Sequence, residues 1–130
     1  MAPGQIATLI LPADTAWTEA DGVADTPETP QPPKPANEDV VAAAKALKSG
    51  GSAAMLFIGG RALRAKGLEL AGKIAAKTGC KVQAAGGTAR IERGAGRVPV
   101  LRLHFVVETA LEMLEGTKSM VLVGTKAPAA

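Results

Sequence analysis

The chain has 130 residues, a formal net charge of +3 and a hydrophobic content of 47%, which together indicate one modest globular core. One Trp, two Phe and no Tyr argue against the aromatic stacking surfaces of single-stranded nucleic acid binders, while one Cys and one His exclude a disulfide framework and the usual zinc sites. The longest apolar run, residues 53–58, is too short to cross a membrane, and we therefore expect a cytoplasmic protein.

The first apolar stretch, residues 6–11, ends at Pro12 and predicts a short buried strand. One strand cannot form a sheet, so this strand would join a sheet later in the chain or belong to an upstream domain. Five of the nine prolines follow in residues 27–35, a composition typical of a stiff, extended linker. A domain boundary is therefore predicted in this segment.

Beyond the linker, apolar residues recur at helical spacing in residues 37–48, where Asn37 is the expected N-cap. Glu38 and Asp39 at the start of this helix, and Lys45 and Lys48 at its end, suit the helix dipole. Two further helices are predicted over residues 61–78 and 106–115. The expected apolar face of the first helix consists of Val40, Val41, Ala44 and Leu47. That of the second helix consists of Leu63, Gly67, Leu70, Ala71 and Ile74, and that of the third consists of Val107, Ala110, Leu111 and Leu114.

Short, fully apolar stretches alternate with these helices and predict strands over residues 52–58, 80–85 and 118–123. This alternation is typical of a parallel sheet with right-handed crossovers, so the predicted fold class is α/β, a Rossmann-like parallel sheet with helices on both faces. The sequence stops just past the third strand, where a doubly wound domain normally continues, and the domain is therefore expected to be incomplete.

Glycines follow two of the predicted strands. Gly59 and Gly60 come after the first strand and Gly124 after the third. Glycines at the carboxyl end of a strand can expose backbone N–H groups to a phosphate, and these three residues are the candidate cofactor-binding positions. Neither turn has the full dinucleotide or P-loop motif, and the interpretation favoured by the residues alone is that glycine permits a tight turn.

Charge is segregated along the chain. Residues 13–40 carry seven acids and one base, whereas residues 61–104 carry ten bases and two acids. Residues 89–105 alone contain four arginines, one histidine and two glycines, a composition that suits either an anion clamp or a long loop over the carboxyl edge of the sheet. His104 has no neighbouring nucleophile, and no catalytic or metal-binding residue is predicted.

The ordered set "LILPADTAW", the proline-rich linker, "MLFIGGRALRAKGLELAGKIAAKTG", "ARIERGAGRVPV" and "MVLVGTKAP" resembles one family. These are thiamine-diphosphate-dependent enzymes of the acetolactate synthase large-subunit type, and "ERGAGRVPV" is the most specific element. The resemblance implies a fragment centred on the central domain. Residues 1–17 would be the last strand of an upstream pyrimidine-binding domain, residues 18–36 an acidic, proline-rich linker, and residues 37–130 a truncated central Rossmann-like domain.

The same resemblance implies a parent that decarboxylates a 2-oxo acid and joins the product to an acceptor, with thiamine diphosphate supplying the chemistry. The sites for thiamine diphosphate and magnesium would lie outside this chain, in the missing pyrimidine- and pyrophosphate-binding domains, and a homo-oligomer is expected. Some relatives bind FAD across the glycine turns, but residues 125–128, "TKAP", depart from the flavin-binding pattern. The expected role of the chain is structural. Two alternatives stay open, a stand-alone nucleotide- or anion-binding module and, less favoured, an Arg-Gly nucleic acid binder.

Overall fold

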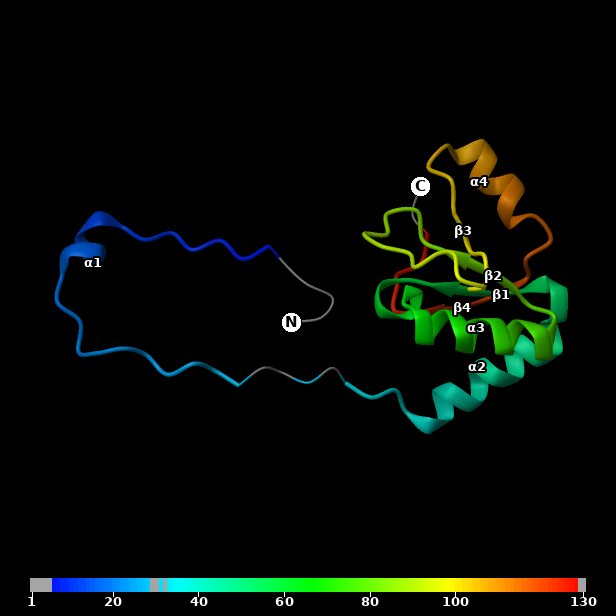
Figure 1. Cartoon of the computed structure of the whole chain (residues 1–130), viewed down its shortest axis with the longest axis horizontal. Coiled ribbons are helices and arrows are strands. Elements are labelled where there is room, and N and C mark those ends of the chain that lie inside the picture. Colours follow the sequence, from blue (N-terminus) through cyan, green and yellow to red (C-terminus); the bar gives the residue numbers. More distant parts are fainter. Residues whose placement is uncertain (1–5, 29–30, 32, 129–130) are drawn as a thin grey trace. The chain divides into compact units, whose positions relative to one another are not determined.

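The computed structural model describes residues 6–28, 31 and 33–128 and divides the chain into two units, Met1–Lys34 and Pro35–Ala130 (Figure 1). In the first unit the described residues form one short helix, α1 (Ala13–Trp17). Residues 6–11 adopt no strand and their side chains are exposed, Ile6 by 97%, so the expectation that they join the sheet formed later in the chain is wrong. Their assignment to an upstream domain stays a prediction. A strand needs a hydrogen-bonded neighbour, and none pairs with this segment in the part of the chain that is described.

The second unit is built on a four-stranded parallel sheet. Its strands are β1 (Ala54–Ile58), β2 (Lys81–Ala84), β3 (Leu101–Arg102) and β4 (Ser119–Val123), in the spatial order β3-β2-β1-β4. The α/β class and the three predicted strands are confirmed. β3 lies inside the segment expected to be a long connection, and two residues are too few to give a periodic signal.

Helices cover both faces of this sheet (Figure 1). α2 (Asn37–Gly50) and α3 (Ala65–Thr78) pack on one face, and α4 (Val107–Leu114) packs on the other. Single turns of 3-10 helix, Gly51–Ala53 and Gly60–Leu63, flank β1. Asn37, the expected N-cap, is instead the first residue of α2. The N-cap position is taken by Ala36, which has an extended backbone and makes no side-chain cap hydrogen bond.

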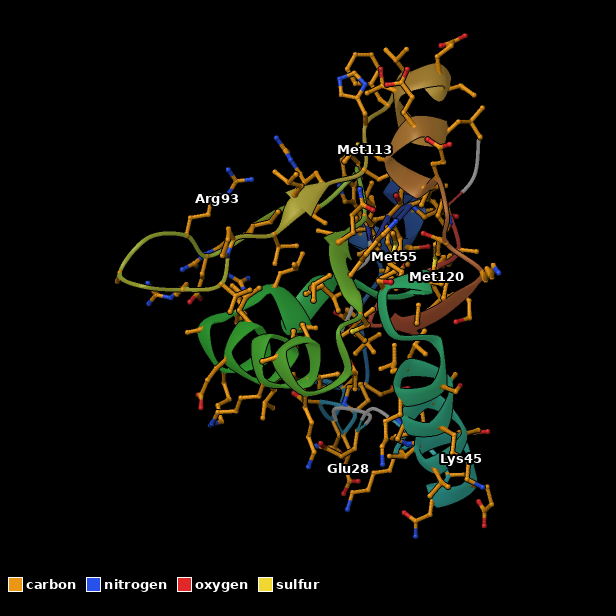
Figure 2. All side chains as sticks on the ribbon, turned by 90° about the vertical axis from the view of Figure 1, so that its right-hand side faces the viewer. Glu28, Lys45, Met55, Arg93, Met113 and Met120 are labelled. Atoms are coloured by element: carbon orange, nitrogen blue, oxygen red, sulfur yellow. The ribbon has the colours of Figure 1, made fainter. Side chains whose placement is uncertain are left out.

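Two apolar clusters form the core. The larger one joins α2 and α3 to the inward side chains of β1, and the smaller one joins Met55 and Phe57 to α4. Figure 2 shows Met55, Met113 and Met120 gathered in the smaller cluster. On α3, Leu68 is fully buried, whereas the expected core residues Leu70 and Ile74 are 48% and 38% exposed.

The predicted faces of the other two helices also needed correction. Val40 and Val41 on α2 are each 52% exposed, and Leu111 on α4 is 64% exposed. Ala44 and Val107 are exposed as well. Spacing identifies a stripe of apolar residues, but the angle at which a helix crosses the sheet decides which part of that stripe is covered.

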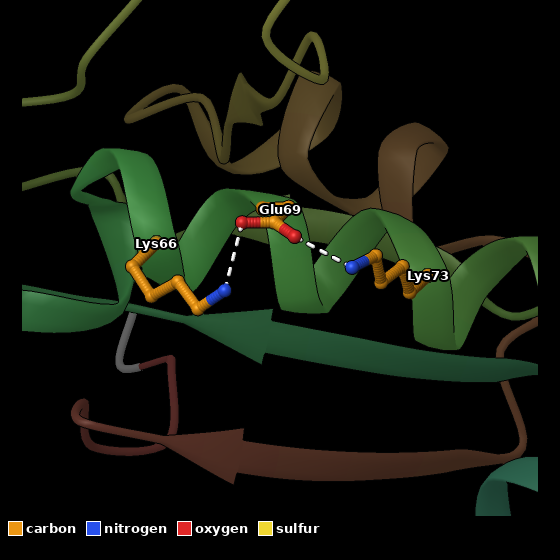
Figure 3. Close-up of polar contacts among 3 residues, drawn as sticks. All are labelled: Lys66, Glu69 and Lys73. Atoms are coloured by element: carbon orange, nitrogen blue, oxygen red, sulfur yellow. Dashed lines mark hydrogen bonds and ion pairs between the residues drawn. The ribbon is translucent and has the colours of Figure 1, made fainter.

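An ion triad lies on the solvent side of α3, where Glu69 accepts hydrogen bonds from Lys66, at 3.0 Å, and from Lys73 (Figure 3). The bond from Lys73 and then that from Lys66 lower the pKa of Glu69 from 4.5 to about 2. Because the pKa of this carboxyl is lower in the folded chain than in the unfolded chain, the ionised carboxylate stabilises the fold at pH values above 4.5. That contribution disappears as the pH falls from 4.5 toward about 2. The side chain is exposed, so salt screens the effect.

We therefore expect the Glu69→Gln variant to be slightly less stable than the wild type at neutral pH and equally stable near the lower pKa. Urea unfolding of both proteins across this pH range, at low and high salt, measures the difference. A stability difference that stayed constant down to about pH 2 would contradict this account of the triad.

Candidate functional site

The three candidate glycines meet at one place in the fold. The strand order reverses between β1 and β4, and Gly59, Gly60 and Gly124 follow the carboxyl ends of these two strands. In open α/β sheets, ligands bind in the crevice at such a reversal. The structure thus brings together two turns that lie more than sixty residues apart in the chain.

The two glycine turns pack directly against each other. The Gly59 N–H donates a 2.9 Å hydrogen bond to the carbonyl oxygen of Val123. A Cβ added to Gly59 would lie 2.7 Å from the Cβ of Thr125 and 2.9 Å from the carbonyl oxygen of Gly124. Gly124 has a φ of +65°, and its added Cβ would lie 2.8 Å from the carbonyl oxygen of Gly59. Close backbone approach therefore explains these glycines without a ligand, and their role in cofactor binding stays a prediction.

Replacement of Gly59 tests this packing. We expect Gly59→Ala to lower the free energy of unfolding by about 2 kcal/mol, because the new methyl group overlaps Thr125 and the Gly124 carbonyl. Urea unfolding followed by circular dichroism measures the loss. Gly87→Ala is the control, because a Cβ at Gly87 meets nothing within 4 Å. Equal stability of the two variants would contradict the packing argument.

The N-terminus of α3, a second place where an anion could bind, already holds a carboxylate. Glu92 Oε2 accepts a 2.8 Å hydrogen bond from the N–H of Ala65, the first residue of α3. Arg90 and Arg97 lie 3.6 and 3.7 Å from the same carboxylate, whose side chain is 21% exposed. The basic segment, residues 89–105, thus contains the carboxylate that caps α3, and two arginines of the same segment neutralise its charge.

The basic segment, residues 89–105, is exposed over residues 93–97, whereas Ile91, Val98 and Val100 pack on the larger apolar cluster. Arg93 lies on this loop, which extends away from the sheet (Figure 2), and Arg102 is exposed on β3. The backbone N–H of Glu92 donates to the Leu63 carbonyl at 3.1 Å, which holds this part of the segment against the 3-10 turn that precedes α3. The geometry fits a loop attached to α3 better than a clamp around an external anion.

Removal of the Glu92 carboxylate should destabilise the loop and α3 together. We expect Glu92→Ala to cost about 1–2 kcal/mol, the usual range for loss of a helix cap, and Glu92→Gln to cost less because its amide oxygen can still accept the Ala65 N–H. Thermal unfolding measures both variants, with Glu112→Ala on the exposed side of α4 as the control. A wild-type melting temperature for Glu92→Ala would be inconsistent with capping.

A pocket of about 580 Å³ opens at the carboxyl edge of the sheet, on the α4 face. Its floor is apolar and includes Phe57, Leu103 and Ala110. Polar groups come from the segments that follow the strands. These segments supply the backbone of Gly86 and Gly87 after β2, the His104 side chain after β3, and the Thr125 and Lys126 side chains after β4, while Phe105 adds apolar surface.

His104 in this pocket has its own local contacts. Its Nδ1 accepts a 3.1 Å hydrogen bond from the Val106 N–H, and its ring stacks on Phe105 with the centroids 4.7 Å apart. Sequence reasoning identified His104 but missed the Gly86–Gly87 pair, although a glycine pair directly after a strand is the same signal that singled out Gly59 and Gly60. The lining combines an imidazole, a hydroxyl and an ammonium group with apolar surface, which suits the binding of a small molecule.

No group of three or more His, Cys, Asp or Glu side chains is placed to hold a metal ion within residues 6–28, 31 and 33–128. Cys80 is buried at the start of β2, where it packs as a small apolar residue. Among the described helices, none has the length and apolar character needed to cross a membrane.

Comparison with known proteins shows a similarity over nearly the whole chain. The chain is 41% identical over 124 residues, 95% of its length, to a Mycobacterium tuberculosis (strain ATCC 25618 / H37Rv) protein named "Putative acetolactate synthase large subunit IlvX". It spans 24% of the length of that relative. No family model and no solved structure match the chain. The resemblance to acetolactate synthase large subunits is thus confirmed at the level of sequence.

Proposed function

We propose that this chain is the central, structural domain of a longer thiamine-diphosphate-dependent enzyme of the acetolactate synthase type. The observation that carries the proposal is the 41% identity across nearly the whole chain to a relative about four times as long. Residues 1–17 are proposed as the last strand of an upstream pyrimidine-binding domain, residues 18–36 as a linker, and residues 37–130 as the truncated central domain. The location proposed for the parent is the cytoplasm.

The activity proposed for the parent is decarboxylation of a 2-oxo acid and transfer of the product to an acceptor, which makes it a transferase. Thiamine diphosphate, with magnesium, would supply the chemistry when bound to other domains. The residues of this chain contribute a rigid α/β layer between those domains. Two features support this role. The first is the pair of apolar clusters, one on each face of the sheet, and the second is the packing of the two glycine turns on one another.

A chimera tests this proposal. The matching segment of the mycobacterial relative is replaced by this chain, and 2-oxo acid consumption with thiamine diphosphate and magnesium is compared with that of the intact relative. We expect the chimera to keep the turnover of the intact relative and the 130-residue chain alone to have none. A second chimera with Phe57→Ala is the control and should lose turnover as its central domain unfolds. Turnover by the isolated chain would refute the structural role.

A second candidate function, binding of a nucleotide or another anion, is favoured by the pocket at the carboxyl edge. This pocket lies beside the reversal between β1 and β4 and contains Lys126 and His104. Calorimetric titration with ADP and FAD tests it, because Lys126→Ala should weaken binding whereas Arg93→Ala, outside the pocket, should not. A dissociation constant of about 1 mM corresponds to a binding free energy of only about 4 kcal/mol. If no heat of binding were measured at that ligand concentration, this candidate would be excluded.

A further inference from the structure

We propose that a group of arginines beside the N-terminus of α3 is a docking surface for an acidic polypeptide segment. This arginine surface consists of five exposed residues, Arg61, Arg64, Arg90, Arg93 and Arg97. All five lie between β1 and β3 in the chain. The binding proposed for them goes beyond the structural role proposed above and does not depend on it.

Hydrogen bonds join the two sequence segments that carry the arginine surface. The backbone N–H of Glu92 donates to the carbonyl oxygen of Leu63 at 3.1 Å, and Glu92 Oε2 accepts the N–H of Ala65 at 2.8 Å. The loop after β2 therefore lies directly beside the start of α3. Arg64, the N-cap residue of α3, is thus brought next to the arginines of the loop.

The arginine surface carries more positive charge than its own carboxylate neutralises. Glu92 Oε1 lies 3.6 Å from Arg90 Nη2, and Glu92 Oε2 lies 3.7 Å from Arg97 Nε. Among the described residues, no ion pair is formed by the other three arginines of the surface. The uncompensated guanidinium groups face solvent, where their combined field attracts anionic groups.

The tip of the loop is a left-handed turn. Gly94, Ala95 and Gly96 have φ angles of +76°, +51° and +72°. The Arg97 N–H and Nη1 both donate to the Gly94 carbonyl oxygen, at 3.0 and 3.2 Å, and close the turn. Positive φ is uncommon at a residue other than glycine, and such strained backbone clusters at binding sites. The turn presents Arg93 and Arg97 from a closed backbone, which reduces the entropy lost on binding.

An acidic polypeptide is the partner that this surface fits best. Guanidinium groups bind carboxylates through paired N–H bonds. The Glu92 carboxylate already fills the inner position at the start of α3, so a single small anion finds no enclosed site there. An extended acidic segment can instead contact the outer guanidinium groups in succession. Residues 61–97 contain no aromatic residue, whereas proteins that bind single-stranded nucleic acid stack its bases on aromatic side chains.

Fluorescence anisotropy of a short, labelled oligoglutamate peptide mixed with the full chain tests the proposal. We expect binding at about 0.1 M salt that weakens at least about tenfold at about 0.5 M salt. Arg93→Ala should raise the dissociation constant about fivefold, because it removes a charge-assisted contact. Lys77→Ala is the matched control. It removes the same charge from an exposed position at the other end of α3 and should change the dissociation constant by less than about twofold.

Two substitutions of Ala95 separate the shape of the turn from its charge. Ala95→Pro cannot keep a positive φ and should raise the dissociation constant about fivefold without any change of charge. Ala95→Gly adopts a positive φ without strain and should bind the peptide as the wild type does. Circular dichroism verifies that each variant is folded.

Four results would overturn the proposal. The first is the absence of binding up to about 1 mM peptide. The second is an equal loss of affinity in Arg93→Ala and Lys77→Ala, which would reduce the effect to net charge. The third is wild-type affinity of a folded Ala95→Pro variant. The fourth is tighter binding of a single-stranded RNA of the same charge, which would assign the surface to nucleic acid.

Discussion

Truncation of Phe57 to alanine should lower the free energy of unfolding by about 3–5 kcal/mol, a large part of the stability of a domain of this size. Phe57 is 1% exposed near the carboxyl end of β1 and is the largest side chain of the smaller cluster, which α4 covers. That face is covered by one helix of eight residues, so few neighbours can move in to fill the cavity. Urea unfolding of the full chain measures the loss.

The matched control is Phe105→Ala. Phe105 is 88% exposed, so its removal costs little buried apolar area. We expect a change within about 0.5 kcal/mol, as for most surface substitutions. If the two phenylalanine variants unfolded at the same urea concentration, the smaller cluster would not be a stabilising part of the core.

Gly67→Ala should destabilise the chain by about 3 kcal/mol, although the same change in an ordinary helix interior stabilises by about 1 kcal/mol. Gly67 lies in α3, and a Cβ added there would lie 2.7 Å from two backbone carbons of Ala62 and closer still to its carbonyl oxygen. Backbone atoms cannot rotate out of the way as a side chain can. The 3-10 turn of residues 60–63 and the start of α3 would have to separate.

Thermal unfolding measures this effect, and about 3 kcal/mol corresponds to a fall in melting temperature of at least about 10 °C for a domain of about 100 residues. Gly87→Ala is again the control, because its Cβ would meet no atom within 4 Å. A Gly67→Ala variant more stable than the wild type would show that helix propensity outweighs the contact with Ala62.

Local sequence signals were sufficient for most of the second unit. β1 is an uninterrupted apolar stretch, and all five of its residues are buried, which is the pattern of a central parallel strand. α3 ends where Gly79 adopts the left-handed conformation, as its position in the sequence indicates. The same signals correctly identified the pair of glycine turns, because tight turns after parallel strands require residues without a side chain.

The sequence by itself therefore determined the type and order of the three helices and of β1, β2 and β4 after residue 36, and with them the parallel α/β class. Tertiary structure decided the remaining features, since each depends on a partner distant in the chain. Among the described residues, none pairs with the strand expected at residues 6–11. β3 forms because β2 offers its edge, and Glu92 caps a helix that begins 27 residues earlier. Periodicity describes one segment at a time, whereas hydrogen bonds between strands, helix caps and pocket walls need two.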